Sequence, residues 1–172
     1  MTSRKTLILL RHGKSGYPPG VADHERPLAE RGWREAGLAG EWLRAEGLTV
    51  DQVLCSTARR TRETLQAAAV EAPAQFQRGL YGASDVEIVG FLTELPETVA
   101  TALVVGHHPG MPETAEALHE LTGKPPSPAL DALLVKYPTS ALTRIEIAGS
   151  WAELAISGGE VTGFHVPRER AI

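Results

Sequence analysis

The stretch Thr6–Gly13 (TLILLRHG) runs from a short apolar segment directly into an arginine, a histidine and a glycine. A short apolar run of this kind is consistent with a buried strand. Similar junctions occur where Gln52–Cys55 leads into Ser56 and where Thr101–Val105 leads into Gly106-His107-His108. We therefore predict three buried strands, each followed at once by polar side chains.

Amphipathic segments separate these strands. Ala29–Glu46 carries small apolar residues at the spacing of one helix face, and Gly47 stands where a helix cap is expected. Ser56 is a typical N-cap residue, so we expect it to open the helix Thr57–Val70. The other predicted elements are helices at Asp85–Glu94 and Met111–Thr122, strands near Gln75–Gln77, Ala141–Ile147 and Glu160–His165, and proline-rich loops at Ser15–Asp23 and Lys124–Pro128.

This alternation of strands and helices predicts an α/β fold with a mostly parallel central sheet flanked by helices. The late strand pair predicts an antiparallel edge near the C-terminus. With 172 residues and a mass of 18.4 kDa, we expect a single domain spanning residues 1–172. In such sheets ligands bind beyond the carboxyl ends of the strands, which directs attention to the residues that follow each strand.

Composition excludes several classes of protein. A net charge of −4 and a pI of about 5.9 argue against a nucleic-acid partner. The longest apolar runs are far shorter than the ~20 residues of a membrane helix, so we expect no membrane contact. A single cysteine excludes a disulfide framework and a thiolate zinc cluster. Because no export signal is visible either, we expect a soluble, cytoplasmic protein.

Basic side chains and histidines follow all three predicted strands. Arg11 and His12 follow the first strand, Arg60 lies shortly after the second, and His107 follows the third. If the strands are parallel, these residues meet at one edge of the sheet. Such a cluster favours an anionic ligand, and guanidinium groups match the geometry of a phosphoryl group.

Four motifs carry a resemblance to a known family. They are LILLRHGKS, DHERPLAERG, VLCSTARRTRET and VVGHHPGM, which span about residues 7–111. Together they resemble the histidine phosphatase (phosphoglycerate mutase-like) superfamily, and most closely its SixA-type phosphohistidine phosphatase branch. The resemblance implies a metal-independent phosphatase that needs no cofactor and acts through a phosphohistidine enzyme intermediate.

The same resemblance assigns roles residue by residue. His12 would be the nucleophile that accepts the phosphoryl group. Arg11 and Arg60 would hold phosphate oxygens, and His107 would donate to the transferred group. Arg60 is preferred to Arg59 because the family pattern spaces Ser56, Arg60 and Thr64 evenly, and His107 is preferred to His108 because it follows Gly106 directly.

A general acid is harder to identify. Asp85 and Glu87 are candidates, although both equally suit the first turn of a helix, where the helix dipole stabilises acidic side chains. An imidazole leaving group is much less basic than an alkoxide and has less need of an acid. A weak or missing acid therefore favours phosphohistidine on a protein partner as the substrate over a phosphomonoester.

Several alternatives remain open. The same scaffold would suit a phosphomonoesterase for a small phosphorylated metabolite, or a module that binds phosphate without turnover. A cysteine mechanism is disfavoured because Arg60 follows Cys55 after four residues instead of the five that such loops use. Asp23-His24-Glu25 is a conceivable metal cluster, but neighbouring residues rarely all face one ion, so we expect no metal. Arg26 is interpreted as a structural residue at the rim.

Overall fold

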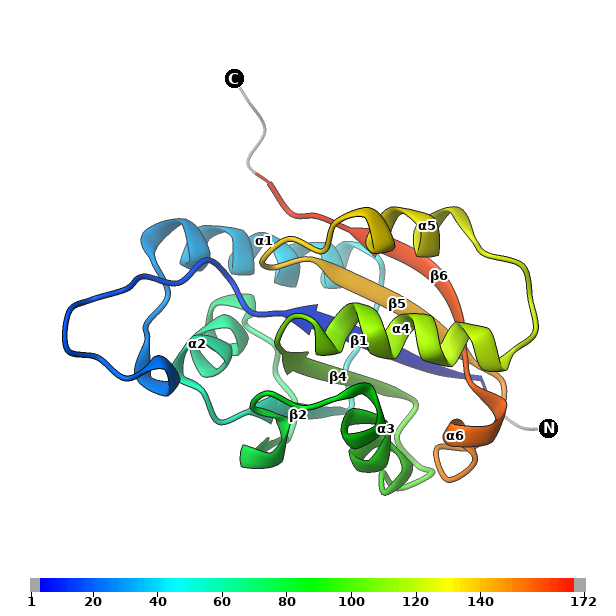
Figure 1. The fold of residues 1–172 in the computed structure, drawn as a ribbon. Helices are drawn as coiled ribbons and strands as arrows, with labels where there is room; N and C mark the ends of the chain where they lie inside the picture. Colours follow the sequence, from blue (N-terminus) through cyan, green and yellow to red (C-terminus); the bar gives the residue numbers. More distant parts are fainter. Residues whose placement is uncertain (1–3, 169–172) are drawn as a thin grey trace.

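The computed structural model describes residues 4–168, which form one six-stranded sheet in the order β3-β2-β4-β1-β5-β6 (Figure 1). The strands are β1 (Lys5–Arg11), β2 (Gln52–Ser56), β3 (Ala74–Gln77), β4 (Thr101–Gly106), β5 (Leu142–Ile147) and β6 (Glu160–His165). The pairs β1–β4, β2–β4 and β2–β3 are parallel, whereas β5 runs antiparallel to both β1 and β6. The predicted α/β fold and its antiparallel C-terminal edge are confirmed.

Helices cover both faces of this sheet. They are α1 (Glu30–Ala45), α2 (Arg59–Ala68), α3 (Asp85–Thr93), α4 (Gly110–Leu121), α5 (Pro128–Val135) and α6 (Leu154–Ser157), with short 3-10 turns η1 (Asp23–Glu25) and η2 (Arg78–Leu80). Across residues 4–168, no helix combines the length and the apolar content that crossing a membrane requires.

Strand β1 supplies both hydrophobic cores because successive strand side chains point to opposite faces of the sheet. Leu7 and Leu9 belong to the core that contains residues of α3, α4, α5 and α6. Ile8 and Leu10 belong to the core beside α1 and α2. All four leucine and isoleucine side chains are fully buried. This double burial explains why the segment reads as a continuous apolar run.

The register of β1 and β4 places their ends level. Leu10 pairs with Val105 and Arg11 with Gly106, so His12 and His107 emerge from the sheet side by side. The His12 amide also donates to the Gly106 carbonyl at 3.0 Å. The sheet itself therefore brings the two predicted histidines together.

One sequence prediction needs correction, and two helices have no counterpart in the sequence predictions. Ser56 does not cap α2: it ends β2, and α2 begins at Arg59 after an extended Ala58 that provides no side-chain cap. Helix α5 was not predicted, although the Ser127 hydroxyl accepts from the Leu130 amide at 3.1 Å and Pro128 is its first residue. The predicted Lys124–Pro128 loop therefore ends in a capping signal, and the short α6 between β5 and β6 was also missed.

Candidate active site

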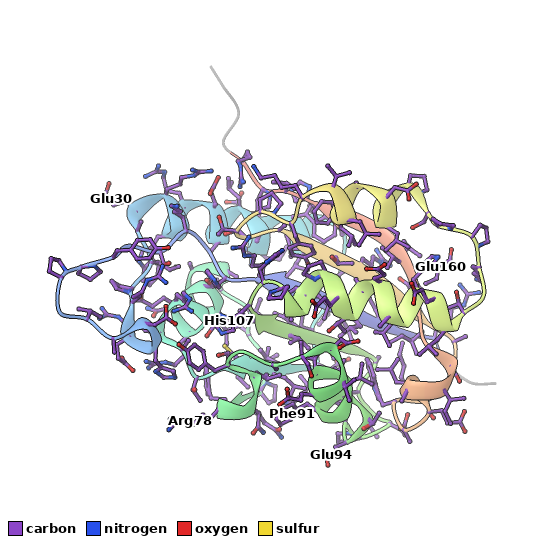
Figure 2. All side chains as sticks on the ribbon, in the orientation of Figure 1. Glu30, Arg78, Phe91, Glu94, His107 and Glu160 are labelled. Atoms are coloured by element: carbon purple, nitrogen blue, oxygen red, sulfur yellow. The ribbon has the colours of Figure 1, made fainter. Side chains whose placement is uncertain are left out.

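The predicted site residues gather at the carboxyl edge of the parallel strands. Arg11 ends β1, Arg60 lies in the first turn of α2, and His107 follows β4. Figure 2 shows His107 beyond the end of β4, between the strand and α2. A cavity of about 170 Å³ opens here, and it is lined by Arg11, His12, Lys14, Ser15, Tyr17, Arg26, Arg60 and Thr139.

His12 is held in one tautomer by its own backbone. Its Nδ1 lies 2.7 Å from the Gly13 carbonyl oxygen, which can only accept, so Nδ1 carries the proton and Nε2 keeps a free lone pair. His12 as a whole residue is 8% exposed. Burial lowers the pKa of His12 to about 3, since the bond to Gly13 only partly offsets desolvation and the charges of Arg60 and Arg11 act in the same direction as burial. His12 is therefore a neutral imidazole at physiological pH.

His107 faces His12 across the site. The two ring centroids lie 5.4 Å apart at an interplanar angle of 58°. Nε2 of His107 lies 2.8 Å from the Ser56 hydroxyl, so Nδ1 is the nitrogen left to contact a ligand. Burial, followed by the charge of Arg60, lowers the pKa of His107 to about 4. Ser56 thus contacts a site histidine instead of capping a helix.

Two arginines, half-buried Arg11 and buried Arg60, supply the positive charge. Nη1 of Arg11 donates to the Tyr137 carbonyl at 2.6 Å, and Nη1 of Arg60 donates to the Asp23 carbonyl at 2.7 Å. Within the part of the chain that the structure describes, neither Nε atom has a hydrogen-bond partner. Burial lowers the pKa of Arg11, but guanidinium groups stay charged in proteins. The site therefore retains donors and charge that a phosphoryl group would satisfy.

Helix α2 is tied directly to the turn that carries His12. The Thr64 hydroxyl accepts from the Gly13 amide at 2.9 Å and donates to the Arg60 carbonyl at 2.7 Å. Thr64 is fully buried. Thr64 thus connects the backbone next to His12 with the backbone of Arg60.

Sequence reasoning missed the acidic contact at the mouth of the site. The Asp23 carboxylate accepts from Arg26 at 2.8 Å and from Arg60 at 3.1 Å, and the Tyr81 hydroxyl donates to it as well. Tyr81 first, then Arg26 and Arg60, hold the pKa of Asp23 well below its usual range. Asp23 belongs to the motif DHERPLAERG of the family resemblance, but nothing local points to Tyr81, which lies 58 residues further along the chain.

The two candidate acids lie on α3. The Glu87 carboxylate accepts from the Ser84 amide at 3.2 Å and the Ser84 hydroxyl at 3.0 Å, which completes a capping box at the start of α3. Asp85 borders a different groove, between α3 and α4. These positions explain both carboxylates as helix-terminal residues, and the acid role of either one stays a prediction.

Residues next to the predicted site residues differ from them in exposure and contacts. Arg59 is 48% exposed and pairs with Glu63 at 3.5 Å, whereas Arg60 is buried in the site. His108 is exposed beside buried His107. Cys55 is buried in the core next to α1 and α2, and burial raises its pKa to about 12, which keeps it a thiol.

The side chains of the Asp23-His24-Glu25 segment do not converge on one point. Nε2 of His24 contacts the Thr57 hydroxyl at 2.9 Å and its Nδ1 contacts Glu25 at 2.8 Å, while Asp23 faces the arginines. Among residues 4–168, no group of three histidine, cysteine or acidic side chains is arranged to hold a metal ion.

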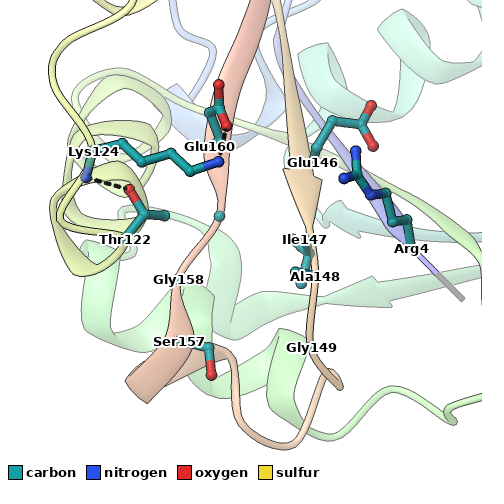
Figure 3. A pocket seen from close by; sticks show the side chains of 11 residues that line it. Arg4, Thr122, Lys124, Glu146, Ile147, Ala148, Gly149, Ser157, Gly158 and Glu160 are labelled. Atoms are coloured by element: carbon teal, nitrogen blue, oxygen red, sulfur yellow. Dashed lines mark hydrogen bonds and ion pairs between the residues drawn. The ribbon is translucent and has the colours of Figure 1, made fainter. Parts of the chain in front are cut away.

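A second cavity, of about 200 Å³, lies at the opposite edge of the sheet, beside the last residue of β5 (Figure 3). Its charged side chains are Arg4, Lys124, Glu146 and Glu160. Lys124 pairs with Glu160 at 2.5 Å, so cation and anion neutralise each other there. It shares no residue with the cavity around His12.

Comparisons with known proteins identify the family. Residues 7–82 match the model of the histidine phosphatase superfamily (branch 1). The uncharacterised protein Rv1276c of Mycobacterium tuberculosis is 45% identical over 159 residues, which cover 92% of this chain and 100% of that protein. Phosphohistidine phosphatase SixA of Escherichia coli is 29% identical over 109 residues, covering 60% of this chain and 67% of SixA.

A solved structure is similar over nearly the whole chain. It comes from Nakamurella multipartitia and bears the provisional name phosphohistidine phosphatase SixA. The TM-score is 0.90 at 37% identity, and the match covers 96% of this chain and 97% of the other.

Proposed function

The chain belongs to the histidine phosphatase superfamily and is a phosphatase, and from that premise we propose that it removes the phosphoryl group from phosphohistidine on a protein partner. The observation that carries the proposal is the neutral His12, whose unprotonated Nε2 lies in a pocket lined by the guanidinium groups of Arg11 and Arg60. A neutral imidazole in an electropositive pocket is suited to attack phosphorus.

The first step transfers the phosphoryl group to the enzyme. Nε2 of His12 forms a bond to phosphorus while the bond from phosphorus to the substrate imidazole breaks. Arg11 and Arg60 hold the oxygens of the transferring group, and Nδ1 of His107 contacts one of them. Because these donors are fixed by Tyr137, Asp23 and Ser56, they need little rearrangement as charge develops.

The second step returns the enzyme to its starting state. Water attacks the phosphorus of phospho-His12, the bond to Nε2 breaks, and inorganic phosphate leaves. The proton stays on Nδ1 of His12, which donates to the Gly13 carbonyl throughout, so the ring leaves as the same neutral tautomer that attacked.

The choice of a phosphohistidine substrate is supported by the positions of the carboxylates. Glu87 is engaged in a helix cap and Asp85 borders another groove, positions that favour helix-terminal roles over protonation of an alkoxide. A protonated phosphoimidazole releases a neutral imidazole, so it needs no general acid from the enzyme. This argument favours a phosphoramidate bond over a phosphomonoester bond.

A substrate panel combined with trapping of the phosphoenzyme tests the proposal. We expect much faster hydrolysis of a phosphohistidine protein and of free phosphohistidine than of sugar phosphates. A labelled phosphoenzyme should be acid-labile and alkali-stable, and should disappear in His12→Ala. The exposed neighbour provides the control, since His108→Ala should retain the label. Faster turnover of sugar phosphates would favour the phosphomonoesterase, and phosphate binding without turnover would favour a non-catalytic module.

A further inference from the structure

We propose that the loop Tyr17–Ala22 binds an apolar patch beside the phosphohistidine of the substrate protein and thereby selects that substrate. This inference rests on the proposed function and concerns the specificity of the same pocket. In Figure 1 the loop projects at the left, beyond the first strand and helices α1 and α2.

The loop is unusually apolar for a projecting segment. Its sequence is YPPGVA, without a charged residue. Tyr17 is 77% exposed and Val21 is 38% exposed, and Pro19 and Gly20 are exposed as well. Single exposed apolar residues are ordinary on protein surfaces, but a cluster next to a ligand pocket is characteristic of a binding surface.

The base of the loop is firmly closed. Nε of Arg26 donates to the Gly16 carbonyl at 3.0 Å, Nη2 donates to the Ser15 hydroxyl at 2.5 Å, and Nη1 reaches Asp23 on the returning side. The Gly16 amide adds a bond to the Pro27 carbonyl at 3.0 Å. With Pro18 and Pro19 restricting the backbone between these contacts, the loop loses little conformational entropy on binding.

Arg26 also orients the exposed aromatic ring. Its guanidinium lies 3.7 Å from the centroid of Tyr17, which is a close cation–π contact. One face of the Tyr17 ring is therefore covered by the protein, while most of the side chain remains accessible. An aromatic ring held in this manner is typical of interface residues that contribute strongly to binding.

Tyr17 connects the loop to the reaction site. It lines the cavity that holds His12, whereas Val21 lies outside that cavity on the same loop. A ligand small enough for a 170 Å³ cavity fills it without covering Val21. A protein that delivers its phosphohistidine to His12 must instead pass its surface over the loop. The absence of charge from Tyr17 to Ala22, together with the exposed side chains of Tyr17 and Val21, favours an apolar surface over a charged one.

Two short phosphohistidine peptides test this inference, one with leucine and valine flanking the phosphohistidine and one with serine. We expect kcat/KM to be about tenfold higher for the apolar peptide, in line with the effect of a single strong contact. Val21→Asp should remove this preference and change turnover of free phosphohistidine by less than about twofold, because Val21 lies outside the pocket. Tyr17→Ala should also reduce the preference, measured as the ratio of kcat/KM for the apolar peptide to kcat/KM for the serine peptide.

Val86→Asp is the matched control. Val86 is 75% exposed on α3, so the same substitution introduces the same charge away from the loop. It should leave the peptide preference intact. Equal rates for the two peptides with the unmodified enzyme, or an unchanged preference in Val21→Asp, would overturn the inference. So would a shift in oligomeric state in Val21→Asp without a change in preference, which would assign the loop to contacts between copies. If no phosphohistidine compound is hydrolysed while sugar phosphates are, the proposed function itself fails.

Discussion

Replacing Gly32 by alanine should lower kcat. Gly32 lies in the first turn of α1 and packs against the backbone of Lys14, which follows the nucleophile His12 by two residues. A Cβ at position 32 would lie 2.1 Å from the Lys14 carbonyl oxygen and 3.1 Å from the Lys14 nitrogen. Lys14 follows His12 by two residues, and its carbonyl accepts from the Ala29 amide at 2.9 Å. To restore an ordinary contact, helix and loop must separate by about 1 Å.

Two consequences follow from that separation. Overpacking typically costs about 1–3 kcal/mol, and the better helix propensity of alanine returns up to about 1 kcal/mol, so we expect Gly32→Ala to lower the free energy of unfolding by about 1–2 kcal/mol. A shift of about 1 Å in the turn that carries His12 can reduce kcat about 100-fold. Urea denaturation measures the first effect, and initial rates on free phosphohistidine measure the second.

Substitutions at two other glycines of α1 distinguish a loss of stability from a loss of catalysis. At Gly37 a Cβ would lie 3.7 Å from the Ala67 carbonyl oxygen, an ordinary contact, so Gly37→Ala should be neutral or stabilising and fully active. At Gly40 it would lie 1.9 Å from the Ala68 carbonyl oxygen, so Gly40→Ala should lose stability while the folded enzyme keeps most of its kcat. The reasoning would be refuted by wild-type kcat in Gly32→Ala, or by an equal loss of kcat in Gly40→Ala.

Three further predictions concern charge and protonation. The pKa of His12 is about 3 in the folded protein against 6.5 ordinarily, so between these values the unfolded chain binds a proton that the folded protein does not. The free energy of unfolding should therefore fall as pH drops from 6.5 toward 3, and it should fall less steeply with pH in His12→Gln. Denaturant titrations at several pH values measure this dependence, and equal slopes for the two proteins would contradict the argument that burial lowers the pKa of His12. Arg60→Ala should lower kcat/KM by about 100-fold or more, whereas Arg59→Ala should stay within about twofold of wild type, and similar losses in steady-state assays would reverse the choice between them. Cys55→Ser should keep its turnover, since its buried thiol is protonated, and loss of the phosphoenzyme in this variant would restore the cysteine mechanism.

The strand order along the chain and the residues at the strand ends were predictable because their signals are local. The run from Leu7 to Leu10 is continuous because both faces of β1 are buried, and this pattern is visible without coordinates. Local signals failed where a distant residue competed for a side chain. Ser56 has the chemistry of an N-cap, but its hydroxyl contacts His107, 51 residues away, and α2 begins later.

The acidic network around Arg60 shows the same limitation. Asp23 belongs to one of the motifs of the family resemblance, but its contact with Tyr81 depends on how η2 packs beside the loop that follows β1. From the sequence, Glu87 suits both a general acid and the first turn of a helix, where the helix dipole stabilises an acidic side chain. The structure adds its capping bonds with Ser84, which account for the carboxylate as a helix-terminal residue and leave the acid role a prediction.

The chain's order of residues determined which groups are available for the reaction: an arginine and a histidine after one strand, an arginine after the next, and a histidine after a third. Tertiary structure decided their chemical state. The level ends of β1 and β4 set His12 beside His107, and burial makes both rings neutral although their ordinary pKa of 6.5 would leave them partly protonated. Desolvation depends on everything packed around a group, so no local stretch of sequence specifies it.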